Sequence, residues 1–475
     1  MTSLTNPSNP TLPASDGLTI AQQLAAFADE FRHDTIPHEI AEVAKGLILD
    51  AIGCALASTS FDFSHRILAG MRGIGEEGQC SVIGRPDHLP MRDAALVNGA
   101  LIHGLDYDDS HLGAILHPGV SSLVCALAVC EKTDRSGRDI LSAYVLGVEN
   151  VVRIAKAANG AFHHFGYHPT GLVAHFSCAI TAAWLYGLNA NQITMAQGIA
   201  GSTAAATQEF LAEGAWNKRL HPGWAAVGGI TAANLARAGT VGPTRPYEGR
   251  HGLYNTHLHH LADTVDYNII TKGLGSEWEL LNVAVKPYPV CHFMHACGDC
   301  ALLLQKKHSI DPSNIEKIVA YVAEPTLHIV AEPVERKKRP ANDYDAKFSV
   351  HFFVAACLIR GHFGFAEMNN GSLVDPTILS LANKVEAVAD PQSLHPTYCS
   401  GGVTIKMKDG KEYSLHERIN RGAGERALTR QEIEEKFFIN AELAVSKGRA
   451  QEIRDAVYKL EQLSAREFGA IIGRG

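Results

Sequence analysis

Long apolar stretches with helical spacing dominate the first 275 residues and constrain the fold more than any other feature of the sequence. In residues 40–57, Ile40, Val43, Leu47 and Ile48 lie on one stripe because apolar side chains recur three and four residues apart. Similar segments follow at 93–105, 121–132, 139–158, 171–188, 190–209 and 223–238. Several are apolar nearly all round, so neighbouring helices must cover them. The pattern predicts a large all-helical domain.

The pattern changes near Trp278. Residues 315–322 alternate as a strand, and Asp409-Gly410, a dipeptide typical of tight hairpins, separates two further strand segments at 403–407 and 413–415. Helices are predicted between these strands, at 345–359 and 376–388. After Gly424 the chain returns to helical segments, at 430–443 and 448–463.

These segments predict a mainly α fold with two domains. Residues 18–280 and 421–475 form the all-helical domain, and residues 281–420 form a smaller α+β domain inserted into it. Residues 1–17, which are rich in Ser, Thr, Asn and Pro, are predicted to be a flexible tail.

Composition excludes several classes of protein. The chain carries 42 Lys and Arg against 50 Asp and Glu, a net charge of −8, which disfavours a dedicated nucleic-acid binder. No apolar run approaches the roughly 18–20 residues that span a bilayer. The ten cysteines are scattered through apolar segments, as is typical of a reducing compartment, and the N-terminus lacks the features of a secretory signal. We expect a cytoplasmic protein with no nucleic-acid or membrane partner.

Histidine followed by proline is the most informative local pattern. It occurs at His117, His168, His221 and His395, whereas 24 histidines and 20 prolines in 475 residues give about one such pair by chance. The first three pairs precede apolar helical segments, and proline is favoured in the first turn of a helix. Each histidine is then predicted at a helix N-terminus, where free N–H groups attract anions. If the three helix N-termini converge, they would bind a polycarboxylate. The alternative is that they are three ordinary connections between a loop and a helix.

Two charged clusters accompany these histidines. Asp106, Asp108 and Asp109 lie close enough in sequence to repel one another, which can supply a base or a protonated acid. Lys218 and Arg219 stand just before His221 and can clamp carboxylates. For both clusters, a solvated surface loop is the alternative interpretation.

A third cluster contains potential metal ligands but predicts no metal site. Cys291, His292, His295, Cys297 and Cys300 lie within ten residues of one another. Zinc sites of this kind draw a second ligand pair from a distant segment, and none is evident in the sequence. We therefore expect neither a metal nor another cofactor, with Cys297 and Cys300 buried on a helix.

Taken together, the segments resemble the MmgE/PrpD family, which includes 2-methylcitrate dehydratase, cis-aconitate decarboxylase and iminodisuccinate epimerase. The resemblance runs in order over residues 20–465, on LILDAIGCALA, DYDDSHLGAILHPG, GYHPTG, KRLHPGWAA, KPYPVCHFMH and AKFS, which begin at residues 47, 106, 166, 218, 286 and 346. It implies a helical domain, a smaller α+β lid, a cleft between them, a homodimer and no metal cofactor.

The resemblance also implies site residues. Its active-site positions fall on Asp106, His117, His168 and Lys218. We expect substrate binding from Ser110, Arg219, Lys286, Cys291 and His292. The chain departs from the animal decarboxylase of this family in two ways: the spacing from Ser110 to His117 is one residue longer here, and Cys291 occupies a position where that enzyme has a histidine.

The resemblance, together with these residues, leads us to expect a hydro-lyase that dehydrates a small tricarboxylate, such as 2-methylcitrate or another 2-alkylcitrate, without a metal. Lys218, Arg219 and Lys286 would hold carboxylates. Either His117 or His168 would take the proton, and the other, or Asp106, would protonate the leaving hydroxyl. The alternatives are a cis-aconitate-type decarboxylase, an epimerase or isomerase of a small dicarboxylate, and a family member without catalytic activity.

Overall fold

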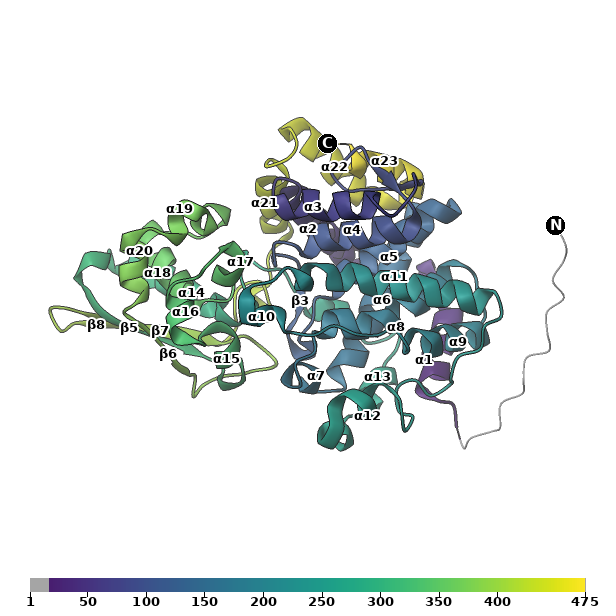
Figure 1. Cartoon of the computed structure of the whole chain (residues 1–475), viewed down its shortest axis with the longest axis horizontal. Helices are drawn as coiled ribbons and strands as arrows, with labels where there is room; N and C mark the ends of the chain where they lie inside the picture. The colour runs from purple at the N-terminus through teal and green to yellow at the C-terminus, as the bar shows by residue number, and fades with distance from the viewer. Residues whose placement is uncertain (1–16, 475) are drawn as a thin grey trace.

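Four helices form the centre of the larger domain in the computed structural model, which describes residues 17–474 (Figure 1). They are α5 (Pro118–Thr133), α6 (Gly137–Lys156), α8 (Pro169–Leu185) and α11 (Asn217–Arg237). Around them pack α1 (Ile20–Glu30), α2 (His38–Ser58), α4 (Met91–His103), α9 (Ala190–Ala200), α21 (Arg430–Ala441), α22 (Lys447–Tyr458) and α23 (Ala465–Gly473). The predicted tail at 1–17 lies, but for Gly17, outside the described residues.

Glycines let α11 approach its neighbours closely. A Cβ atom on Gly99 of α4 would lie 2.5 Å from the Cα of Gly223 on α11. On the other side of α11, a Cβ atom on Gly229 would lie 2.4 Å from the Cβ of Cys178 on α8. Only glycine permits such distances between backbones. This packing holds α11 directly against both α4 and α8.

The smaller domain is built on a four-stranded sheet with the order β6-β5-β7-β8. Its strands are β5 (Ile315–Val322), β6 (Val385–Ala389), β7 (Gly401–Met407) and β8 (Glu412–Glu417). Helices α14 (His295–His308), α18 (Val350–Arg360) and α20 (Pro376–Ala382) pack with this sheet around a separate buried cluster. The strands predicted at 315–322, 403–407 and 413–415 are confirmed.

Several predicted helices end early, among them the one at 448–463, which stops at Tyr458. The helix predicted at 376–388 stops at Ala382, and Val385–Ala389 instead forms β6, which pairs in parallel with β5. The helix predicted at 190–209 stops at Ala200. At 385–389, a strand partner more than sixty residues away overrides the local pattern.

The two domains appear as separate lobes in Figure 1, with the C-terminal helices beside α2 in the larger lobe. Their buried clusters follow this division: the larger ends near Val285 before resuming at Phe437, and the smaller covers Tyr288–Met407 together with Phe210. In the described part of the chain, no helix is long and apolar enough to cross a membrane. All ten cysteines are buried and unpaired.

Candidate active site

A cavity between the two domains contains eight of the nine predicted site residues. The empty space among its lining residues is about 600 Å³, part of which is open to solvent. The eight residues that line it are Asp106, Ser110, His117, His168, Lys218, Lys286, Cys291 and His292. The cavity therefore joins predicted site residues that are up to 186 positions apart in the sequence.

A short strand pair brings the first and last of these segments together. Strand β3 (Ser110–His111) pairs with β4 (Val283–Ala284), and Lys286 lies two residues after the end of β4. Asp106 precedes β3 in a left-handed backbone conformation, with φ of 53°. This conformation is uncommon outside glycine, although aspartate tolerates it better than most residues. The turn directs the Asp106 carboxylate at the two lysines described next.

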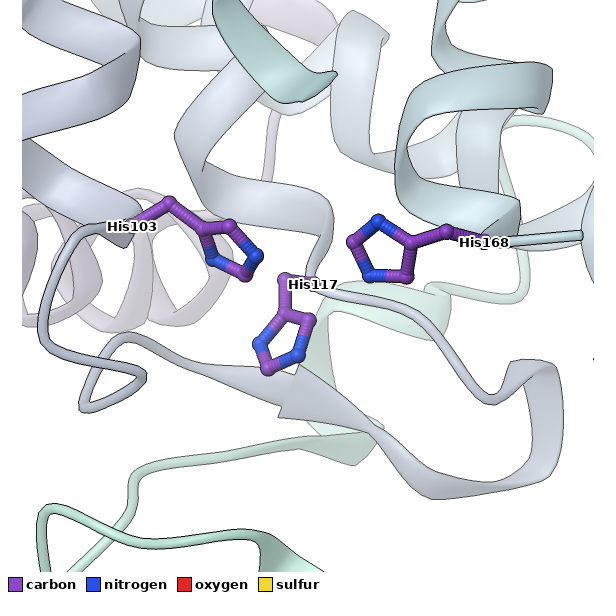
Figure 2. Close-up of side chains that lie close together, drawn as sticks. All are labelled: His103, His117 and His168. Atoms are coloured by element: carbon purple, nitrogen blue, oxygen red, sulfur yellow. The ribbon is translucent and has the colours of Figure 1, made fainter. Parts of the chain in front are cut away.

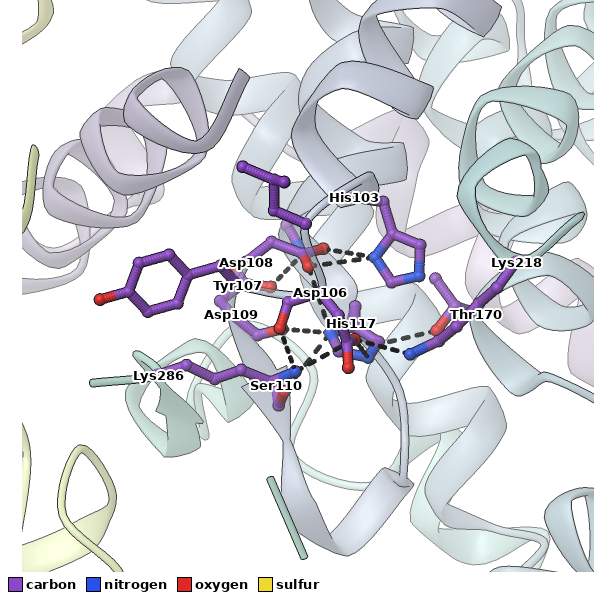
Figure 3. A network of polar contacts seen from close by, with 12 residues as sticks. His103, Asp106, Tyr107, Asp108, Asp109, Ser110, His117, Thr170, Lys218 and Lys286 are labelled. Atoms are coloured by element: carbon purple, nitrogen blue, oxygen red, sulfur yellow. Dashed lines mark hydrogen bonds and ion pairs between the residues drawn. The ribbon is translucent and has the colours of Figure 1, made fainter. Parts of the chain in front are cut away.

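Asp106 forms a buried ion triplet with Lys218 and Lys286 (Figure 3). Its Oδ1 atom lies 2.6 Å from Nζ of Lys218 and 3.2 Å from Nζ of Lys286. Burial alone would raise the pKa of Asp106, but the two ammonium groups outweigh it and hold this pKa well below its usual value. The triplet carries a net positive charge in an enclosed site, and such a charge attracts an anionic ligand.

His117 presents an unprotonated nitrogen to this triplet. It is the N-cap of α5, with Pro118 in the first turn, as the His-Pro pattern predicts. Its Nδ1 donates to the backbone carbonyl of Asp109 at 2.7 Å, because a carbonyl can only accept. The neutral ring therefore has its lone pair on Nε2, which lies 3.7 Å from Oδ1 of Asp106.

The protonation state of His117 follows from its surroundings. Burial lowers its pKa well below the usual value; Asp108 opposes this, while Lys286 and Lys218 lower the pKa further. At neutral pH the ring is uncharged, and Nε2 is available to accept a proton.

His168 is held by a second histidine. It is the N-cap of α8, again with proline in the first turn, so this part of the His-Pro prediction is also confirmed. Its Nδ1 shares one proton with Nδ1 of His221 across 3.0 Å. Burial, followed by the neighbouring His221 and Lys218, lowers the pKa of His168 well below its usual value.

The third His-Pro pair is not at a helix start, and that prediction is wrong. Helix α11 begins at Asn217, and Pro222 lies inside it. Proline lacks the N–H that would bond to the carbonyl four residues earlier, that of Lys218. His221 nevertheless faces the site from the first turns of α11, through its contact with His168.

His103 is a residue of this site that the sequence reasoning missed. It ends α4, is fully buried, and bonds through Nδ1 to the carboxylate of Asp108 at 2.9 Å. Its ring lies 4.6 Å from that of His117 and 5.6 Å from that of His168, between centroids (Figure 2). The sequence did offer a signal for this residue: His103 ends an apolar helix and stands five residues before Asp108.

The three rings of His103, His117 and His168 bring nitrogen atoms within 4.8 Å of one another, a spacing that a metal ion could use. The chemistry around them disfavours a cation. The ammonium groups of Lys218 and Lys286 already pair with Asp106, the nearest carboxylate to His117 Nε2, and would repel a second cation. The residues present fit proton transfer better than metal ligation.

Arg219 does not line the cavity, so its predicted contact with substrate is corrected. Its guanidinium is buried with its carbon 4.1 Å from the ring centroid of Phe63 and 4.4 Å from that of Tyr344. Its Nε donates to the carbonyl of Gly104 at 2.9 Å. Arg219 thus stabilises the end of α4 near Asp106 through cation–π contacts and this hydrogen bond.

The smaller domain contributes Cys291 and His292 to the cavity wall. Burial raises the pKa of the Cys291 thiol, with a further rise from Asp106. Nε2 of His292 is 2.7 Å from the Asn420 amide, whereas Nδ1 is buried with no protein partner among the described residues. Cys297 and Cys300 lie buried on α14, as predicted.

Comparison with known proteins agrees with this arrangement of two domains. The MmgE/PrpD N-terminal domain matches residues 22–263, and the MmgE/PrpD C-terminal domain matches residues 288–462. A cis-aconitate decarboxylase-like protein of Aspergillus oryzae is 27% identical over 93% of this chain and 94% of its own. Human cis-aconitate decarboxylase is 26% identical over 94% of this chain and 92% of its own. The mitochondrial 2-methylcitrate dehydratase of Yarrowia lipolytica is 24% identical over 82% of this chain and 77% of its own.

Proposed function

Because the chain belongs to the MmgE/PrpD family, we propose that it is a hydro-lyase that dehydrates a small tricarboxylate, such as 2-methylcitrate or another 2-alkylcitrate, by acid–base chemistry without a metal. The observation that carries the proposal is the neutral His117 beside the ion triplet of Asp106, Lys218 and Lys286. This arrangement supplies a base and two cations at one point of an enclosed cavity.

The dehydration begins with removal of a proton from the carbon next to a carboxylate. His117 Nε2 accepts that proton, while Lys218 and Lys286 stabilise the negative charge that develops on the carboxylate. The neighbouring C–O bond then breaks and an alkene forms. Asp106 is held ionised, so it cannot protonate the leaving hydroxyl. The His117 imidazolium carries the required proton and returns it to the hydroxyl, which restores the neutral ring. If His168 donates to the hydroxyl instead, the proton on His117 must pass to His168 to close the cycle.

The proton balance favours dehydration over decarboxylation. In dehydration, the proton removed from the substrate carbon later protonates the leaving hydroxyl, so the enzyme supplies no net proton. The cycle can therefore start with neutral histidines. Loss of carbon dioxide leaves a carbanion that needs a net proton from the enzyme, and a histidine that supplies it has to be charged beforehand. Burial lowers the pKa of both His117 and His168, which opposes such a charge.

Decarboxylation of a cis-aconitate-type substrate is the second candidate. It is supported by five relatives of 26–27% identity that carry decarboxylase names. In addition, Ser110 keeps a hydroxyl near His117, with its Oγ atom 3.4 Å from Nδ1.

Product analysis separates the candidates. The purified protein, after exhaustive chelation, is incubated with 2-methylcitrate, citrate and cis-aconitate, and products are identified by mass spectrometry. We expect loss of water from 2-methylcitrate. Loss of carbon dioxide from cis-aconitate alone would establish the second candidate, and a change of chirality without a change of mass would indicate an epimerase. Activity that required an added metal would contradict the proposed mechanism.

A further inference from the structure

The wall of the cavity is divided into two chemically different parts. The polar part consists of the ion triplet and the histidines around it. The apolar wall, as we name it, consists of Leu112, Ile115, Leu116, Phe210, Leu211, Phe293, Ile329 and Phe348. Most of the accessible surface inside the cavity is apolar. A tricarboxylate with a methyl substituent offers little apolar surface to match this wall.

The apolar wall begins at the side chains expected to bind carboxylates. The ring centroid of Phe348 lies 5.1 Å from Nζ of Lys218. The Phe210 ring lies 6.2 Å from that of His168, centroid to centroid. A ligand whose carboxylates bind the lysines therefore has its remaining substituent beside aromatic rings.

Both domains build the wall. Ile115 follows β3 in the larger domain, whereas Phe293 and Ile329 belong to the smaller domain. Ile115 has φ of 51°, a left-handed conformation that is unfavourable for a β-branched side chain. Such strain is typical of ligand-binding sites, where the surrounding structure maintains it.

We propose that the substrate carries an alkyl chain of several carbons, which the apolar wall binds while the ion triplet binds the carboxylates. This inference rests on the proposed function for the tricarboxylate head group. Each methylene transferred from water to an apolar wall is expected to improve binding roughly fourfold until the wall is filled. If the wall serves only to exclude water during catalysis, a longer chain gives no improvement.

A chain-length series tests the proposal. Values of kcat/KM are measured for 2-methyl-, 2-propyl- and 2-pentylcitrate, with products identified by mass. Binding is measured separately by calorimetry with tricarballylates bearing the same chains, which lack the hydroxyl and cannot be dehydrated. We expect both kcat/KM and affinity to rise with chain length. Affinity that is flat or falls beyond methyl overturns the proposal.

A matched pair of variants locates the binding surface. Leu211 is half-buried in the apolar wall, whereas Leu281 is 47% exposed and outside it. Leu211→Gln is expected to reduce the gain in affinity per methylene, and Leu281→Gln to preserve it. An unchanged gain in Leu211→Gln overturns the assignment to this wall.

The two readouts keep the proposals distinguishable. If no tricarboxylate reacts but the tricarballylates bind more tightly with length, the proposed reaction fails and the alkyl-binding wall stands. If 2-methylcitrate is dehydrated and longer tricarballylates bind no tighter, the reaction stands and the alkyl-binding wall fails.

Discussion

Asp106 determines the charge of the cavity. Alone, two buried ammonium groups would repel each other, but with Asp106 between Lys218 and Lys286 one positive charge remains. Because His117 and His168 are neutral at rest, a trianionic substrate is only partly neutralised by the lysines. The hydrogen-bonded network around the triplet, drawn in Figure 3, then has to hold the remaining carboxylates by N–H and O–H donation.

Substitution of single cavity residues tests this assignment. We expect His168→Ala and Lys218→Ala each to lower turnover by roughly 10²-fold or more, the effect expected for positioned acid–base and electrostatic groups. His395→Ala is the control: His395 also precedes a proline but does not line the cavity, so turnover should change far less. Steady-state kinetics on variants with unchanged circular dichroism decides this. Near-normal turnover in Lys218→Ala together with loss in His395→Ala would relocate the site.

The pH dependence of kcat/KM tests the role of His117. A base must be unprotonated, and burial holds its pKa well below 6.5 in the free enzyme. We therefore expect kcat/KM to stay constant between about pH 6.5 and 8 and to fall only at lower pH, as the ring becomes protonated. A rate that increases as the pH falls from 8 to 6 would instead indicate a required imidazolium, as decarboxylation needs.

At the scale of elements, Lys347 joins the loops that carry the site. Its Nζ donates to the carbonyl of Leu105 at 2.7 Å, next to Asp106, and to that of Pro289 at 2.9 Å, near Cys291. Its own carbonyl accepts from the N–H of Cys291 at 2.8 Å. Lys347 therefore links the two domains directly beside the cavity.

The ionisation of Lys347 makes this link measurable. Burial lowers its pKa from 10.5 to about 7, although Asp343 and Asp106 oppose the shift. Between these two pH values the unfolded chain binds a proton that the folded chain does not, so this residue's contribution to the free energy of unfolding rises with pH across that window. Lys347→Met removes this contribution. The free energy of unfolding of both proteins is measured with urea at about pH 7.5 and 9.5. Between these pH values the wild type should gain stability relative to the variant. Equal changes in the two proteins would contradict the lowered pKa of Lys347.

Elements with strong local signals were predictable from the sequence, and those set by distant partners were not. Apolar spacing located most of the long helices, and the His-Pro pairs placed His117 and His168 at helix starts. The strand β6 was missed because its partner β5 is distant in sequence. Arg219 was misassigned because Phe63 and Tyr344, which enclose its guanidinium, lie far away along the chain.

At the scale of the molecule, we propose a homodimer formed through the helical domain. Trp224 and Leu235 are 55% and 41% exposed on α11, and their separation of eleven residues places them on one face of the helix. Exposed apolar residues on one face favour an interface. Trp224→Arg should shift a micromolar sample toward monomer in light scattering, whereas Val374→Arg, an exposed position in the smaller domain, should not. A monomeric wild-type protein would contradict the proposal.

The most direct test of the account compares His117→Gln with the wild type on 2-methylcitrate. Glutamine keeps an N–H donor but cannot accept the proton, so alkene formation, followed by mass spectrometry, should fall by roughly 10²-fold or more. Calorimetry with tricarballylate should show that the variant still binds the tricarboxylate head group, because the ion triplet is intact. Alkene formation at the wild-type rate in His117→Gln would contradict the central claim that His117 is the base of this site.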